Sequence, residues 1–272
     1  MTFDIDFVTF GGGLPRYAAA AQRLGGQAGR SGAFANVSAL TAEDIDPTFR
    51  ARHASILRSD TRGFGYWVWK PFVISQALEI GRSDFLLYAD AGCTLNLDNS
   101  TAVSRLTDYL DFAAEHSVCS FVMDHQPESK WTKRDLLTLC GISSSDRESG
   151  QRVAGVILLR RCDMTRDLVG TWSRIAEMEG YRFLDDSPSH EPENEGFIEH
   201  RHDQSILSCI LKSAGLPAIA DETYFGKDWN DAGREFPLWV TRNVASSAMR
   251  SVVSRRIRSF ARASRPSHQP NS

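Results

Sequence analysis

The sequence predicts an α/β fold in which helices cover both faces of a mostly parallel sheet. Short apolar segments alternate along the chain with longer segments whose apolar residues recur at helical spacing. The apolar run at 85–88 is continuous, which is typical of a central strand buried on both faces. With 42% hydrophobic and 24% charged side chains, the 272 residues have the composition and length of one sizeable globular domain.

The individual elements follow from local patterns of apolar residues and turn formers. Strands are expected at 3–10, 83–90, 118–123 and 153–159, with a short one near 217–220. Helices are expected at 17–24, from Pro71 to 80, at 101–116, 164–179 and 203–214, with a short helix opening at 130–135. Loops are expected at 25–38, which is rich in Gly, Ala and Ser, at the polar and mobile segment 141–150, and at the acidic segment 185–199.

The bulk charge and the cysteines exclude several classes of protein. The net charge of −3 gives no indication of nucleic-acid binding. Five cysteines stand singly without a Cys-x-x-Cys pair, which favours reduced thiols over a disulfide or zinc framework. Residues 1–10 do not read as a secretory signal, and no apolar run approaches the roughly 20 residues of a membrane span. The expected location is therefore the cytoplasm.

The end of the chain differs in charge from the rest. No acidic residue follows Glu235, whereas seven arginines do. We therefore expect a domain over 1–243, followed at 244–272 by a basic C-terminal helix and a disordered tail. In 245–263 apolar residues alternate with arginines, a pattern typical of helices that lie on anionic lipid at the inner face of a membrane. The alternative is a solvated terminus.

Two strand ends carry candidate ligand-binding residues. The first predicted strand runs from Phe10 into Gly11 and Gly12, and glycines there allow a ligand to approach the backbone N–H groups before a helix. A tight turn without a ligand would also explain them. Asp90 ends the most apolar strand, where a carboxylate can bind a ribose hydroxyl or a cation, or can cap a turn.

Asp203 is the candidate catalytic residue. A carboxylate can accept a proton from a hydroxyl group or stabilise a developing positive charge. The alternative is that Asp203 caps the predicted helix 203–214.

Five segments together resemble the GT-A glycosyltransferases of bacterial polysaccharide and capsule synthesis. Leu86-Leu87-Tyr88-Ala89-Asp90-Ala91-Gly92-Cys93 resembles their DxD region. Gly65-Tyr66-Trp67-Val68-Trp69-Lys70-Pro71 is similar to the stretch that precedes it. Three later segments are also similar to segments of this group, namely 151–159, His202-Asp203-Gln204-Ser205 and 237–243.

This resemblance implies a GT-A-like fold and a hexosyltransferase that uses a nucleoside-diphosphate sugar and a saccharide or lipid-linked acceptor. The donor-binding residues it implies are Phe10, Gly11, Gly12, Arg62, Lys70, Tyr88, Asp90, Ala91 and Gly92. Those expected on the acceptor side are Trp131, Thr132, Lys133, Ala154, Gly155 and Gln204.

One departure from the DxD pattern concerns the metal. Where a second Asp is expected, the chain has Gly92. Our expectation is that Asp90 and His202 bind a divalent cation, Mn²⁺ or Mg²⁺. The alternative is that Lys70 and Arg62 supply the positive charge instead.

Two other functions remain open at this point. A sugar-nucleotide nucleotidyltransferase shares the nucleotide-binding half of such a fold, but usually has a basic glycine-rich loop after the first strand. A non-catalytic carbohydrate-binding relative would explain the missing second Asp.

Overall fold

The computed structural model describes residues 4–244. The strands are β1 Ile5–Gly11, β2 Asn36–Thr41, β3 Phe85–Ala89, β4 Thr94–Leu95, β5 Val118–Cys119, β6 Phe121–Pro127, β7 Gly150–Arg152, β8 Val156–Arg160, β9 Ile219–Ala220 and β10 Leu238–Trp239. The helices are α1 Pro15–Ser31, α2 Pro47–Arg52, α3 Gly63–Tyr66, α4 Trp69–Ile80, α5 Ser100–His116, α6 Glu128–Trp131, α7 Arg134–Leu139, α8 Ser144–Glu148, α9 Asp163–Tyr181 and α10 His202–Ser213, with a 3₁₀ turn at Ala42–Asp44.

The central sheet has five strands in the order β2-β1-β3-β8-β5. β2, β1 and β3 are parallel, whereas β8 is antiparallel to both β3 and β5. Four of the five strands therefore run in the same direction. This confirms the predicted α/β fold with a mostly parallel sheet.

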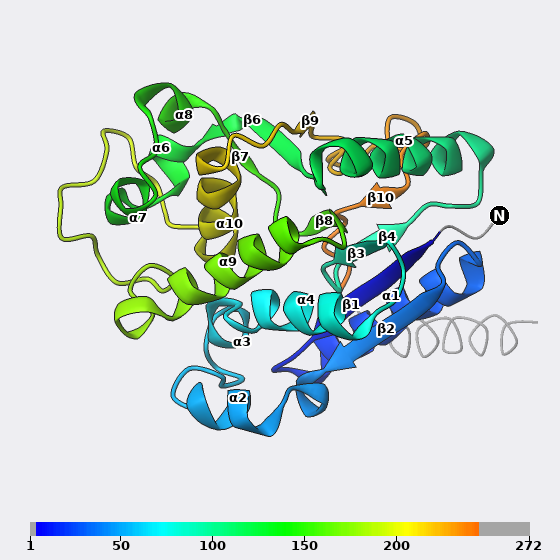
Figure 1. The fold of residues 1–272 in the computed structure, drawn as a ribbon, viewed down its shortest axis with the longest axis horizontal. Helices are drawn as coiled ribbons and strands as arrows, with labels where there is room; N and C mark the ends of the chain where they lie inside the picture. Colours follow the sequence, from blue (N-terminus) through cyan, green and yellow to red (C-terminus); the bar gives the residue numbers. More distant parts are fainter. Residues whose placement is uncertain (1–3, 245–272) are drawn as a thin grey trace, which may run out of the picture.

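Helices pack on both faces of this sheet, because side chains alternate across each strand. Val8, Leu86 and Ile157 face a core formed with α4, α9 and α10. Their neighbours Phe7 and Leu87 face a second core formed with α1 and α5. Figure 1 shows α4 and α9 side by side along one face of the sheet.

Two smaller sheets border the central one. Strands β7, β6 and β9 form one of them, and β10 pairs with β4 to form the other. The pairing of β10 brings the segment 237–244 back across the sheet, beside the loop that follows β3. We call residues 237–244 the C-terminal strap.

The predicted loop at 25–38 is wrong. α1 continues to Ser31, and β2 begins at Asn36. Gly25 lies against Ala39 of β2, and a Cβ on Gly25 would come within 2.5 Å of the Ala39 side chain. The glycine lets helix and strand approach closely, so tertiary packing offsets its low helix propensity.

The segment 141–150 contains a short helix rather than only a loop. Ser143 caps α8, and the Lys212 ammonium group donates to the carbonyl oxygens of Asp146 and Ser149. No helix within 4–244 is long and apolar enough to cross a membrane. The predicted basic helix at 245–263 lies outside the described residues.

Candidate active site

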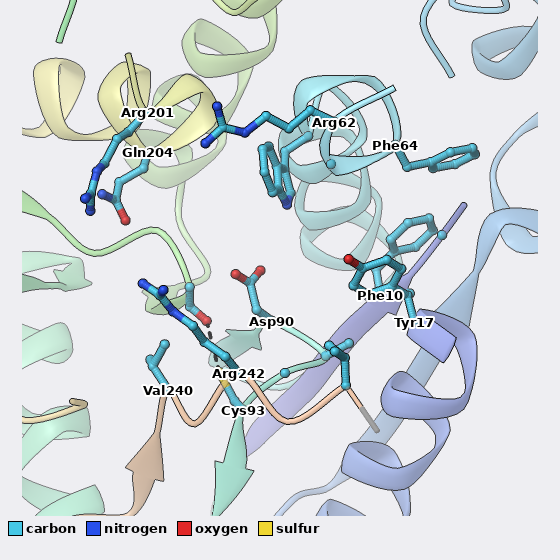
Figure 2. Close-up of a pocket in the computed structure, with 18 of the residues that line it drawn as sticks. Phe10, Tyr17, Arg62, Phe64, Asp90, Cys93, Arg201, Gln204, Val240 and Arg242 are labelled. Carbon is cyan, nitrogen blue, oxygen red and sulfur yellow. Dashed lines mark hydrogen bonds between the residues drawn. The ribbon is translucent and has the colours of Figure 1, made fainter. Parts of the chain in front are cut away.

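A cavity of about 810 Å³ opens at the carboxyl ends of β1 and β3. β8 runs antiparallel, so its first residues reach the same edge, and Asp90 N donates to Gly155 O at 2.8 Å. Figure 2 shows Asp90 at the centre, with Phe10, Tyr17 and Phe64 on one side and Arg201 and Arg242 on the other. A smaller cavity of about 390 Å³ shares Asp90 and Gly155 with the larger one.

The glycine turn after β1 forms one wall of the larger cavity. A Cβ on Gly11 would lie 2.0 Å from Tyr17 O, so this glycine is required for the start of α1 to pack against β1. A Cβ on Gly12 would lie 2.5 Å from the Phe64 ring. The Phe10 ring stands 4.1 Å from that of Trp69, and both residues line the cavity. The glycine turn and the aromatic rings packed against it therefore form the aromatic end of the cavity.

A left-handed turn joins this wall to α10. Gly63, Phe64, Gly65, Tyr66 and Trp67 all have positive φ, an arrangement that L-residues rarely sustain over consecutive positions. The turn places Phe64 against the glycines, while the Tyr66 and Trp67 rings pack 5.2 and 5.5 Å from that of His202. His202 also has positive φ. Four non-glycine residues with positive φ thus lie at this contact between the turn and α10, and such residues are common at functional sites.

Lys70 links two carboxylates beneath the cavity. Its side chain is 2% exposed, and Nζ lies 2.6 Å from Asp203 Oδ2 and 3.1 Å from Asp90 Oδ1. Nζ also donates to Ala154 O at 3.3 Å. Burial by itself lowers the pKa of Lys70, but the two carboxylates outweigh it and raise the pKa. The ammonium group is therefore already neutralised within the protein.

The two carboxylates differ in their environment. Asp90 is 36% exposed towards the cavity and accepts a hydrogen bond from the Tyr88 hydroxyl at 2.6 Å. Asp203 is 7% exposed, and burial raises its pKa to about 6 against the opposing attraction of Lys70. Asp203 does not cap α10, because Arg201 occupies the N-cap position. Its side chain is directed to Lys70 instead.

The donor residues expected from the sequence come together here. Eight of them line one or both cavities, namely Phe10, Gly11, Gly12, Arg62, Lys70, Asp90, Ala91 and Gly92. Tyr88 is fully buried and reaches the site only through its hydrogen bond to Asp90.

Only some of the residues expected on the acceptor side line a cavity. Ala154, Gly155 and Gln204 line the smaller cavity. Thr132 and Lys133 do not reach either cavity: Thr132 donates to the buried Glu128 carboxylate, and Lys133 Nζ donates to the Ser187 carbonyl. Trp131 lies behind Arg201, whose guanidinium carbon is 3.9 Å from the centre of its ring. It can orient Arg201 without lining the cavity.

The two histidines are buried and not at the surface. His200 Nε2 hydrogen-bonds with Phe183 O, and burial lowers its pKa well below the usual value. His202 Nδ1 hydrogen-bonds with Leu184 O, and burial also lowers its pKa. Both rings are therefore neutral and held by backbone carbonyl groups.

The described residues do not fit a divalent cation. Mg²⁺ and similar ions take about six oxygen ligands, whereas Asp90 offers only the one carboxylate oxygen that does not contact Lys70 and the Tyr88 hydroxyl. Within 4–244, no group of three or more His, Cys, Asp or Glu side chains could hold a metal ion. The expected pair of Asp90 and His202 therefore gains no third protein ligand in this part of the chain.

Three arginines at the cavity are not among the residues predicted from the sequence. Arg16, Arg201 and Arg242 all line it, and each comes from a different segment. Arg16 follows the glycine turn, Arg201 precedes α10, and Arg242 lies in the C-terminal strap. No local pattern distinguishes them from surface arginines, because their meeting depends on the fold.

No protein-family model matches the chain, and neither does any curated protein. The galactosyltransferase LgtC, solved with donor and acceptor sugar analogues, is 14% identical over 98% of both chains, with a TM-score of 0.47. A glycosyltransferase involved in glycosylation of the major capsid of PBCV-1 is 10% identical over 92% of this chain and 98% of that one, with a TM-score of 0.45. The bifunctional glycosyltransferase WbbM is 11% identical over 88% of this chain and 45% of that one, with a TM-score of 0.48.

All three solved structures are glycosyltransferases, the class that the sequence resemblance names. Identities and TM-scores as low as these do not establish a function. The assignment of a function therefore depends on the chemistry of the cavity.

Proposed function

We propose that this chain is a glycosyltransferase that moves a sugar from a nucleoside-diphosphate-sugar donor to a saccharide or lipid-linked acceptor. The observation that carries the proposal is the composition of the 810 Å³ cavity, which combines an aromatic end, guanidinium groups and a carboxylate. A nucleotide base is apolar and flat, a diphosphate is anionic, and a sugar presents hydroxyl groups. The three parts of the cavity match these three chemistries.

Asp203 is the residue that we propose as the base. The acceptor oxygen would attack the anomeric carbon, its proton would pass to Asp203, and the bond to the diphosphate oxygen would break with its electron pair. A base is most effective when its pKa lies near the working pH, and the pKa of Asp203 is about 6. Lys70 holds this carboxylate beside the smaller cavity and is its positioning residue.

Asp90 is proposed to hold the donor. Its carboxylate can accept hydrogen bonds from ribose or sugar hydroxyls, because one oxygen remains outside the contacts with Lys70 and Tyr88. Gln204 and Gly155 border the same space and are proposed to contact the acceptor. The setting in bacterial surface polysaccharide synthesis, in the cytoplasm or at the inner membrane face, is proposed from the sequence resemblance.

The experiment is a donor screen followed by turnover. Thermal shifts with UDP-, GDP-, CDP- and dTDP-sugars, each in EDTA and in Mn²⁺, identify the donor, and release of the nucleoside diphosphate measures turnover. Asp203→Asn should lower kcat by about 10²–10⁴-fold while the donor Kd changes by less than about threefold. Asp111→Asn, an exposed carboxylate on α5, is the matched control.

Two results would count against the proposal. If no sugar nucleotide shifts the melting temperature or is turned over, with or without metal, the chain is not such a transferase. If pyrophosphate is released from a nucleoside triphosphate and a sugar phosphate, it is a nucleotidyltransferase instead.

A further inference from the structure

The C-terminal strap explains why residue 92 is glycine. Gly92 O accepts hydrogen bonds from Asn243 N at 2.8 Å and from the Thr241 hydroxyl at 2.9 Å. A Cβ on Gly92 would lie 3.2 Å from Arg242 Cα, which is tighter than ordinary van der Waals contact. A side chain at residue 92 would therefore press on the backbone of the hydrogen-bonded strap, and glycine is the residue that fits there without a shift of Arg242.

The same strap delivers a cation to the cavity. Arg242 has a φ of 53°, and its side chain lines both cavities. Figure 2 shows it reaching in beside Asp90 and Gln204. Its guanidinium group forms no hydrogen bond or ion pair with any residue between 4 and 244.

Arg201 is a second cation without a carboxylate partner. Its guanidinium group is stacked on Trp131 and donates to Gln126, both uncharged, and it forms no ion pair with another described residue. Burial lowers the pKa of Arg201, Glu199 raises it, and the like charges of Arg242 and Arg62 lower it further. Arg201, Arg242 and Arg62 all line the smaller cavity.

The guanidinium group of Arg62 forms only weak ion pairs. Its ion pairs with Asp186 and Glu199 measure 3.8 and 3.6 Å, and all three side chains are about half exposed. Exposed pairs of this kind contribute little, so an entering anion can replace them. Lys70, in contrast, is saturated by Asp90 and Asp203. The cationic side chains that remain available to bind an anion in the cavity are therefore those of arginines.

We infer that Arg242 and Arg201, assisted by Arg62, bind the diphosphate of the donor and that no divalent cation is needed for this binding. The inference rests on the proposed function and assigns its anion site. Guanidinium groups bind phosphate oxygens in pairs and stay charged at every working pH, so they can also stabilise a departing diphosphate. The position of the strap then accounts both for the close approach to Gly92 and for the presence of Arg242 in the cavity.

The test is calorimetric titration of the full chain with inorganic pyrophosphate, UDP and GDP, in EDTA, in Mg²⁺ and in Mn²⁺. For the nucleotides that bind, we expect Kd values in EDTA and in metal to agree within about threefold. Arg242→Gln and Arg201→Gln should each weaken binding in EDTA by about tenfold or more, and Arg242→Lys by less. Arg174→Gln, an exposed arginine on α9, should change nothing.

Folding is checked separately by the melting temperature, which Arg242→Gln should leave unchanged because its side chain has no partner among the described residues. Gly92→Asp should weaken nucleotide binding without making it metal-dependent. Sugar-nucleotide binding that appears only with Mg²⁺ or Mn²⁺ would overturn this inference and leave the proposed function intact. Absence of binding by every nucleotide and sugar nucleotide in all buffers would overturn both.

Discussion

At the scale of single residues, the centre of the site is a buried charge network and not a free cation. Lys70 Nζ contacts Asp90 and Asp203, and the Tyr88 hydroxyl adds a hydrogen bond to Asp90. Burying a charge is costly unless it is paired, and here each buried group has a partner of opposite sign. The network therefore fixes the positions of both carboxylates before any ligand arrives.

The raised pKa of Asp203 predicts a pH-dependent stability. Because its pKa is raised from 3.8 to about 6, the folded chain binds a proton more tightly than the unfolded chain. The contribution of Asp203 to the free energy of unfolding therefore falls as pH rises from about 4 to about 6, by roughly 3 kcal/mol, and is constant above that. Asp203→Asn cannot ionise and should lack this slope.

Urea unfolding of both proteins between pH 4 and 7 measures the effect. The difference in stability between Asp203→Asn and the parent should change with pH in this window. A difference that is the same at every pH would contradict the prediction. Asp111→Asn controls for loss of an exposed carboxylate.

At the scale of elements, the left-handed turn at 63–67 connects the aromatic end of the cavity with α10. Trp69 Nε1 donates to Gly63 O at 3.0 Å, and Val68 N donates to Gly65 O, which holds the turn against the start of α4. The two glycines of the turn adopt positive φ without steric strain, whereas Phe64, Tyr66 and Trp67 are sterically strained there. The packing of their three rings compensates for that strain.

Gly65→Ala should destabilise the protein by about 1–3 kcal/mol, because φ is 89° there and the new Cβ would lie 3.1 Å from Ile56 O. The same change at Gly29 should stabilise α1 by about 0.5–1 kcal/mol, since a Cβ there meets no atom within 4 Å. Urea unfolding compares the pair. Equal stability of Gly65→Ala and the parent would show that the turn is not strained.

At the scale of the whole molecule, Arg23 ties the first helix to the C-terminal strap. From α1 its Nη2 donates to Ala91 O and Cys93 O at 2.8 Å and to Asn243 O at 3.2 Å. These bonds join segments that are about 70 and 220 residues away from Arg23 in the sequence. The strand end that carries Asp90 is thus held between the first helix and the strap.

Arg23→Met should lower the free energy of unfolding by about 3 kcal/mol, because hydrogen bonds from a charged donor to three carbonyl groups are lost. Protease cleavage within 237–244 should also become faster, since the strap loses one of its anchors. Arg30→Met, exposed near the end of the same helix, should have little effect on either measurement. Unchanged stability and cleavage in Arg23→Met would remove the proposed link between α1 and the strap.

The sequence by itself determined the alternation of strands and helices and two of the central residues. The predicted helices at 101–116 and 164–179 and the strand at 83–90 have the expected type and nearly the expected bounds. Their apolar periodicity is a local property that reports which face is buried. Asp90 and Asp203, which both line the smaller cavity, were also predicted from local patterns, since strand ends and helix starts can be recognised locally. The strand β2 was missed because it is a partly exposed edge strand behind a glycine-rich helix.

Only the tertiary structure decided which charges are available to a ligand. Lys70, expected at the diphosphate, is neutralised by two carboxylates that lie 20 and 133 positions further along the chain. Lys133 and Thr132 are buried in contacts beneath the site, while Arg201 and Arg242 enter the cavity without an acidic partner among the described residues. A sequence lists charges but not which of them already pair, because pairing depends on distances that only long-range packing sets.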